Sequence, residues 1–215
     1  MVKGEETVKG IVISCFPQGE YGKRLLLLTD KYGKITVFAT GAARQGSKII
    51  GACRPFTCGE FTLCEGKGAK NLHGIKVIES FEGIPLNPDT AFYGSYLLEV
   101  ADHFAREGMT EQDAKNMLNL IYVALDALSE HLLPPMLIRR IYELRILVQE
   151  GTYTLGPEDE DNESSLQWQY VIRSPLSRLF SQEVWKEADA GSFIVNVAHL
   201  FNREVPQKFN SAEYL

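Results

Sequence analysis

Hydrophobic and β-branched residues gather in five short stretches of the first eighty residues, and these stretches predict five β-strands. The strands are expected at residues 7–14, 24–29, 34–39, 56–65 and 72–81. Turn residues separate them, and Gly59 inside the fourth stretch indicates a bulge or a sharp bend. Residues 41–54, after the third stretch, are compatible with a short helix or a turn. This pattern favours a small closed barrel of the OB type, although other small barrels fit nearly as well.

After residue 81 the apolar positions recur every three to four residues, which is the spacing of helices. Three helices are predicted, at residues 89–107, 110–130 and 135–150. Asn87 and Thr110 are suitable N-cap residues, and Gly151 is a suitable helix stop. Residues 165–215 indicate further short helices. We therefore expect an α+β chain with a five-stranded OB-fold domain in residues 1–81 and an all-helical domain in residues 82–215.

The charge changes sign at the same boundary. Residues 1–80 hold 12 Lys and Arg against 7 Asp and Glu, a net charge of +5, whereas the remaining residues hold 10 against 21, a net charge of −11. A basic module joined to an acidic one suggests a polyanionic partner for the front half.

Residues typical of catalytic sites are scattered rather than grouped. There is no phosphate-binding glycine loop, and the four histidines are far apart in the sequence. The spacing of the four cysteines is not that of a zinc ribbon, so we expect reduced, small apolar side chains. No apolar run reaches the roughly 18–20 residues that span a bilayer, and the first ten residues lack a signal-peptide pattern. These observations predict a cytoplasmic protein that is not an enzyme.

The basic residues of the front half fall mainly on loops that border the binding face of an OB barrel. The predicted DNA-binding cations are Lys23, Arg24, Lys34, Arg44, Lys48, Arg54, Lys67 and Lys70. Tyr21 and Phe16 are candidates for stacking on bases. The alternative is that the loop cations serve solubility and that Phe16 plugs the barrel.

Several segments resemble the RecO family of bacterial recombination mediators. They are residues 10–12 (GIV), 24–29 (RLLLLT), 40–48 (TGAARQGSK), 53–56 (CRPF) and 203–211 (REVPQKFNS). The resemblance extends over nearly the whole chain and is weaker in the rear half.

The resemblance implies an N-terminal OB domain and a C-terminal helical domain that act by binding, without making bonds. RecO-like proteins bind single-stranded and double-stranded DNA and anneal complementary strands. With RecR they help to load RecA onto DNA coated with single-strand-binding protein (SSB), whose C-terminal tail they contact. A nucleoid-associated protein is therefore implied.

Many family members carry a four-cysteine zinc site in the helical domain. Residues 81–215 contain no cysteine, so we expect neither zinc nor another cofactor.

The SSB tail is acidic and ends in an apolar residue, so its site should combine cations with an apolar groove. We expect this site on the helix at residues 135–150, formed by Arg139, Arg140, Arg145, Leu137 and Ile141. The alternative is that these arginines pair with neighbouring acids such as Glu143.

Two functions remain open. The first is a recombination mediator that holds DNA by phosphates and stacked bases. The second is an OB-fold adaptor that acts mainly through protein contacts and binds DNA weakly or not at all, which the net charge of −11 in the rear half favours.

Overall fold

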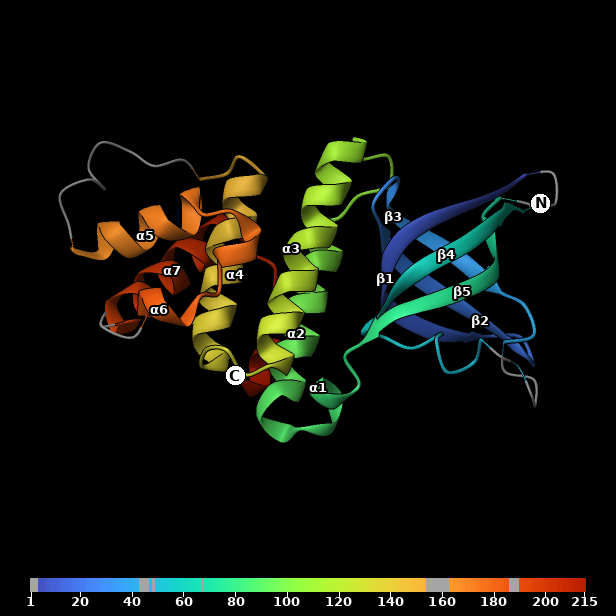
Figure 1. The fold of residues 1–215 in the computed structure, drawn as a ribbon, viewed down its shortest axis with the longest axis horizontal. Coiled ribbons are helices and arrows are strands. Elements are labelled where there is room, and N and C mark those ends of the chain that lie inside the picture. Colours follow the sequence, from blue (N-terminus) through green and yellow to red (C-terminus); the bar gives the residue numbers. More distant parts are fainter. Residues whose placement is uncertain (1–3, 43–46, 48, 67, 154–162, 186–189) are drawn as a thin grey trace. The chain divides into compact units, whose positions relative to one another are not determined.

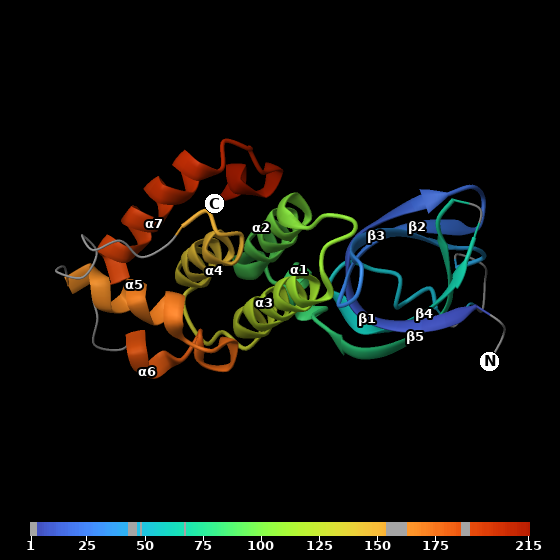
Figure 2. The ribbon, with the colours of Figure 1, turned by 90° about the horizontal axis from the view of Figure 1, so that it is seen from above.

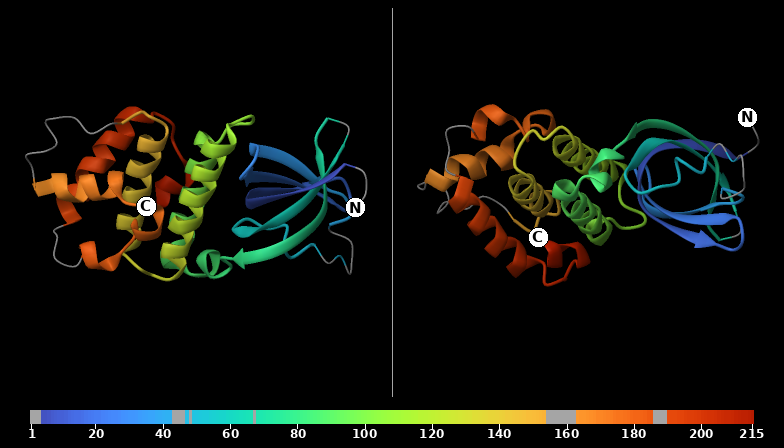
Figure 3. Two further views of the ribbon diagram at one scale, coloured as in Figure 1. Left: turned by 45° about the horizontal axis from the view of Figure 1, so that its top comes forward. Right: turned by 90° about the horizontal axis from the view of Figure 1, so that it is seen from below.

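The front part of the chain is a closed barrel (Figure 1). The computed structural model describes residues 4–42, 47, 49–66, 68–153, 163–185 and 190–215. The strands of the barrel are β1 (Glu5–Gln18), β2 (Gly22–Thr29), β3 (Gly33–Ala39), β4 (Thr57–Glu65) and β5 (Lys70–Ser80). They are joined in the order β1-β2-β3-β5-β4, and β4 pairs with β1 to close the ring (Figure 3). Only the β3–β5 pair is parallel. The predicted five-stranded OB fold is confirmed.

Alternate residues of each strand fill the inside of the barrel. Leu25 and Leu27 of β2 lie in the core with Val37 of β3 and with Phe61 and Leu63 of β4, and none of these side chains is exposed. Side chains alternate between the two faces of a strand, so their neighbours in sequence point outward. The apolar residues at alternate positions of the strands therefore fill the closed barrel.

Gly59 lies where β4 bends, as predicted. The register between β4 and β5 shifts between Cys58 and Gly59, which marks a β-bulge. Gly59 also faces Gly10 across the β1–β4 pair. A Cβ atom on Gly59 would lie 2.6 Å from the carbonyl oxygen of Lys76, so the backbones approach too closely for a side chain.

The described residues of the insertion between β3 and β4 form turns and irregular chain rather than a helix. Cys53 and Ala42 from this segment are fully buried in the barrel core. Burial raises the pKa of the Cys53 thiol to about 11 and that of Cys58 to about 12, although the nearby Lys23 opposes the shift at Cys53. Both thiols therefore behave as small apolar side chains.

The rest of the described chain is helical (Figure 2). The α-helices are α1 (Gly83–Leu86), α2 (Pro88–Phe104), α3 (Glu111–Ser129), α4 (Pro135–Gln149), α5 (Glu163–Arg173), α6 (Gln182–Trp185) and α7 (Ala190–Glu204). Two 3₁₀ turns cover Leu176–Arg178 and Asn210–Tyr214. The buried face of α4 includes Leu137, Ile141 and Leu144, and this helix packs against α5 and α7.

The predicted helix caps are present. The Asn87 side-chain oxygen accepts a hydrogen bond from the Asp89 backbone N–H at 2.9 Å. The Thr110 hydroxyl oxygen accepts one from the Asp113 N–H at 3.2 Å. These bonds satisfy backbone donors that have no partner within the helix. Gly151 follows α4 with a φ of +70°, the left-handed conformation of a helix C-terminus.

The chain divides into two compact units, and each unit is formed by two separate segments of the sequence. The first unit comprises Met1–Glu82 with Ala101–Leu118, and the second comprises Gly83–Val100 with Asn119–Leu215. The segment at 101–118 thus belongs with the barrel. The boundary after residue 81 stays a prediction.

The turn between β2 and β3 holds this segment. The Lys34 N–H donates to the Arg106 carbonyl oxygen at 3.1 Å, and the Gly108 N–H donates to the Tyr32 carbonyl oxygen at 3.2 Å. Gly33 has a φ of +67°, and a Cβ atom there would lie 2.3 Å from the Arg106 oxygen. Glycine is therefore required at position 33 by both its conformation and this contact.

We predict that Gly33→Ala lowers the free energy of unfolding by about 2 kcal/mol or more, because the new methyl group meets backbone and the φ angle is strained. Urea unfolding of the whole chain measures the change. Gly74→Ala in β5 is the matched control, since a Cβ atom at Gly74 meets nothing within 4 Å. Equal stability of the two variants would contradict the proposed close contact.

Candidate nucleic-acid interface

The outer sides of β1, β2 and β3 form one continuous surface, here called the β1–β3 face. Phe16 of β1 pairs with Arg24 of β2, and Arg24 pairs with Phe38 of β3. Directly paired residues of antiparallel strands point to the same side of a sheet. Arg24 is exposed, so the three side chains form a row across the outside of the barrel.

The Arg24 guanidinium lies over the Phe16 ring, with its central carbon 5.2 Å from the ring centroid. This is the geometry of a cation–π contact. The Phe16 side chain remains 48% exposed, so it does not plug the barrel. The pair therefore presents a flat apolar ring and a positive charge to solvent, the two features that a nucleotide base and its phosphate require.

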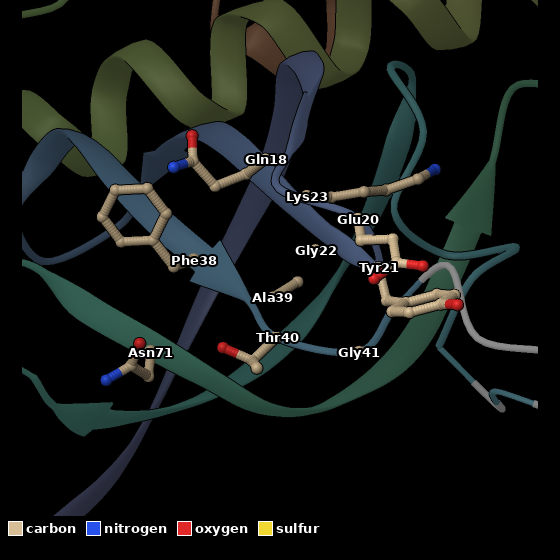
Figure 4. Close-up of a pocket in the computed structure, with 10 residues that line it drawn as sticks. All are labelled: Gln18, Glu20, Tyr21, Gly22, Lys23, Phe38, Ala39, Thr40, Gly41 and Asn71. Carbon is tan, nitrogen blue, oxygen red and sulfur yellow. The ribbon is translucent and has the colours of Figure 1, made fainter.

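A cavity of about 490 Å³ opens at the end of this row (Figure 4). Phe38 and Tyr21 stand on opposite sides of it in the close-up. The side chains of Gln18 and Asn71 and the hydroxyl of Thr40 also line it. Hydrogen bonding to Glu20 raises the pKa of the Tyr21 phenol, which keeps its O–H protonated at neutral pH.

Arg24 is the predicted cation that lies in this row, whereas Lys23 is on the opposite face of β2, since it pairs with the buried Ala39. The Lys23 ammonium donates to the Cys53 carbonyl oxygen at 3.1 Å, which brings β2 next to the loop that carries Arg54. Arg24 and Arg54 are both exposed. Within the described part of the chain, none of these three forms an ion pair.

Two other predicted cations are held by carboxylates. The Lys34 ammonium lies 2.8 Å from the Asp102 carboxylate and also donates to the Asp102 carbonyl oxygen at 2.6 Å. The Lys70 ammonium lies 2.6 Å from Glu6 and 2.8 Å from Glu65. Their charges are largely compensated within the protein. Arg44, Lys48 and Lys67 lie outside the described residues.

Glu6 is the centre of the Lys70 cluster. The Tyr32 hydroxyl donates to it at 2.5 Å and the Lys31 ammonium at 3.0 Å. Partial burial opposes ionisation of Glu6, but the hydrogen bonds from Lys70, Tyr32 and Lys31 hold its pKa at about 2. In turn, Glu6 and Glu65 raise the pKa of Lys70 despite its burial.

Phe38 is the residue of this face that sequence reasoning missed. Lys34, Thr36 and Phe38 alternate with the buried Ile35, Val37 and Ala39 along β3. The alternation therefore placed an aromatic ring on the outer side of a strand, where a ring has little reason to lie unless something packs on it. The binding residues were predicted mainly on the loops, so the outward position of Phe38 on β3 was not considered.

The residues predicted for the SSB tail do not form one surface. Leu137 and Ile141 are buried in the helical core. Arg139 and Arg140 donate to the two oxygens of the fully buried Glu143, at 2.8 and 2.6 Å. Arg145 donates to the carbonyl oxygens of Val171 and Ile172. This arrangement favours the alternative in which the arginines pair within the protein.

Arg139 nevertheless reaches a cavity of about 310 Å³ in the second unit. Its guanidinium carbon lies 4.0 Å from the centroid of the Tyr96 ring. The cavity is lined on its apolar side by Phe201, Val205 and Phe209, and Lys208 adds a second cation. Glu213 also lines it, so the two cations leave a small positive balance, and a partly apolar hollow of this kind suits an acidic peptide with an apolar end.

The residues that the structure describes include no group of three or more His, Cys, Asp or Glu side chains placed to hold a metal ion. None of their helices combines the length and the apolar character needed to cross a membrane.

Comparison with known proteins connects the barrel to one family. Residues 1–81 match the family described as "Recombination protein O N terminal". The DNA repair protein RecO of Exiguobacterium sibiricum is 32% identical over 146 residues, which cover 68% of this chain and 57% of that protein. The DNA repair protein RecO of Caldicellulosiruptor saccharolyticus is 30% identical over 145 residues, with coverages of 67% and 58%. The chain thus matches a little over half the length of these relatives.

The Glu6 cluster predicts a pH-dependent contribution to stability. Because the pKa of Glu6 is lower in the folded protein than its ordinary 4.5, the contribution is present above 4.5 and is lost as the pH falls towards about 2. Glu6→Gln should therefore be less stable than the parent at neutral pH, and the gap should close near pH 2. Urea unfolding across this range measures it, and a gap that does not change with pH would contradict the assignment.

Proposed function

Because the chain belongs to the RecO family, with residues 1–81 as its N-terminal domain, we propose that it is a DNA repair protein that binds DNA on the β1–β3 face. The row of Phe16, Arg24 and Phe38 carries the proposal. Proteins that bind single strands combine aromatic platforms for bases with cations for phosphates. The row supplies both, and Lys23 and Arg54 add two cations that form no ion pair with the described residues.

We further propose that the protein acts as a recombination mediator by binding rather than by bond-making chemistry. In this role it anneals complementary strands and binds duplex as well as single-stranded DNA. It works with RecR to help load RecA onto SSB-coated DNA, and it does so on the nucleoid in the cytoplasm. Residues 81–215 hold no cysteine, so we propose that it does this without the zinc site of many relatives.

We propose that the SSB tail binds in the cavity lined by Arg139 and Lys208, and not at the set of α4 residues predicted from the sequence. Arg139 remains from the predicted set, while Lys208 and the apolar residues Phe201 and Phe209 are new. The buried cluster around Glu143 contains two arginines and one carboxylate, so it keeps a net positive charge beside the cavity. That charge supports binding of an acidic peptide.

An adaptor with weak DNA binding is the second candidate. The compensation of Lys34 by Asp102 and of Lys70 by Glu6 and Glu65 favours it, because these charges are less available to phosphates. An electrophoretic shift beside a pull-down with SSB and RecR separates the two functions. Capture of both partners without any DNA shift would support the adaptor.

Replacing Lys23, Arg24 and Arg54 with Ala should weaken binding of single-stranded DNA and reduce its salt dependence. Each lost phosphate contact lowers the slope of log K against log salt by about 0.7, so the triple variant should lose about 2. Fluorescence anisotropy over a salt series measures both quantities. Replacing Lys76, Lys115 and Arg203, which lie elsewhere and pair with Glu60, Glu111 and Glu204, removes the same charge as a control. Equal losses in the two triple variants would rule out a specific surface.

Lys208→Ala should weaken binding of a synthetic SSB-tail peptide by roughly threefold to tenfold, as expected for loss of one partly exposed charge contact. Isothermal titration measures the affinity. Arg203→Ala is the matched control because Arg203 is a nearby exposed cation that does not line the cavity. Unchanged affinity in Lys208→Ala would place the tail elsewhere.

A further inference from the structure

The ring of Phe38 separates two cavities on the outside of the barrel, and we propose that it is the platform on which two unpaired nucleobases stack. The inference rests on the proposed DNA-binding function and makes it more specific. It places bases in the cavities and their phosphates near Lys23 and Arg24, and it makes the β1–β3 face selective for unpaired strands.

The first cavity, of about 490 Å³, has an aromatic residue on each of two opposite sides. Phe38 and Tyr21 form its opposite sides (Figure 4). Between them the lining residues include Gly22, Ala39 and Gly41, which have little or no side chain. The small residues leave space between the rings, so a planar group can enter and contact an aromatic face.

Three neutral polar groups of this cavity suit a base edge, and Lys23 is the one cation among the described residues that line it. Gln18 and Asn71 carry side-chain amides, which both donate and accept hydrogen bonds, and Thr40 adds a hydroxyl. Glu20 also lines the cavity, and its negative charge opposes a phosphate. Unpaired bases are recognised by such groups along the edges that pairing would otherwise occupy.

A second cavity, of about 600 Å³, lies along β3 and shares Phe38 with the first. Thr36 and Ile35 line it from β3, and Gly66, Gly68 and Lys70 line it from the β4–β5 connection. The Lys70 ammonium is held by Glu6 and Glu65, so the charge of this lining residue is already paired. Because both cavities share Phe38, we place a second base in this one.

Of the two cations here that form no ion pair with the described residues, Lys23 lines the first cavity and Arg24 adjoins it through Phe38. Arg24 is the cross-strand neighbour of Phe38 and stacks on Phe16, and Lys23 points towards Cys53 at the edge of the first cavity. A strand whose bases enter the cavities therefore keeps its phosphates near Arg24 and Lys23. Duplex bases cannot enter without being unpaired and unstacked, which costs a few kcal/mol per base.

The test compares a short oligothymidine with an oligonucleotide of equal length whose central residues are abasic, using fluorescence anisotropy and the full chain. Phe38→Ala should weaken binding of oligothymidine by about 5- to 100-fold, the range for loss of one stacking platform, without changing the salt slope. It should leave binding of the abasic strand unchanged, which also shows that the variant is folded. Phe38→Trp should restore binding. Ile78→Ala, an exposed apolar residue of β5 that lines neither cavity, should behave as the parent.

Other outcomes separate this inference from the proposed function. If the parent binds both strands equally, or if Phe38→Ala weakens both to the same degree, the base subsites are wrong while DNA binding stands. If the parent binds neither strand, the proposed function fails and the subsites fail with it.

Discussion

The pairing register of β1, β2 and β3 is the constraint on which the candidate site depends. Leu25 and Leu27 must face the core opposite Val37 and Ile35, because their burial closes the barrel. In the same register Arg24 must lie outside, between Phe16 and Phe38. A slip of one residue would expose the leucines and bury the arginine, at a cost of several kcal/mol. The barrel core thus fixes the aromatic and cationic row with no further interaction needed.

The net charge of the front half does not show which of its cations are already paired with carboxylates. The front half has a net positive charge, but Lys34 and Lys70 are compensated by carboxylates that lie 68 and 64 residues away in the sequence. These contacts are structural, since Lys34 joins the β2–β3 turn to Asp102 and Lys70 holds the start of β1 through Glu6. Among the described cations that were predicted to bind DNA, Lys23, Arg24 and Arg54 form no ion pair, and Arg24 lies in the aromatic row. In the second unit, Glu143 likewise takes two arginines out of solvent.

Most of the secondary structure could be predicted from the sequence, because it depends on residues that are close together in the chain. Strand alternation, the bulge at Gly59 and the caps at Asn87 and Thr110 all depend on residues a few positions apart, and each was predicted. The predicted strand at residues 7–14 is shorter than β1, because pairing with β2 and β4 extends β1 from Glu5 to Gln18. Helix α1 was missed because its four residues include Pro85 and are too few for a helical period. The partners of Lys34, Lys70 and Arg145 come from distant parts of the chain, so no local pattern could indicate them. The outward position of Phe38, in contrast, could have been predicted, because it follows from the alternation of inward and outward residues along β3.

The most direct measurement of the central claim is photocrosslinking of the whole chain to a single-stranded oligonucleotide that carries 4-thiothymidine, followed by mass spectrometry of the crosslinked peptides. If the β1–β3 face binds unpaired bases, the crosslinks will fall on the peptides that contain Phe16, Tyr21 and Phe38, and excess unlabelled single strand will remove them. Crosslinks confined to the helices, or to the outer side of β5 around Ile78, would contradict the account.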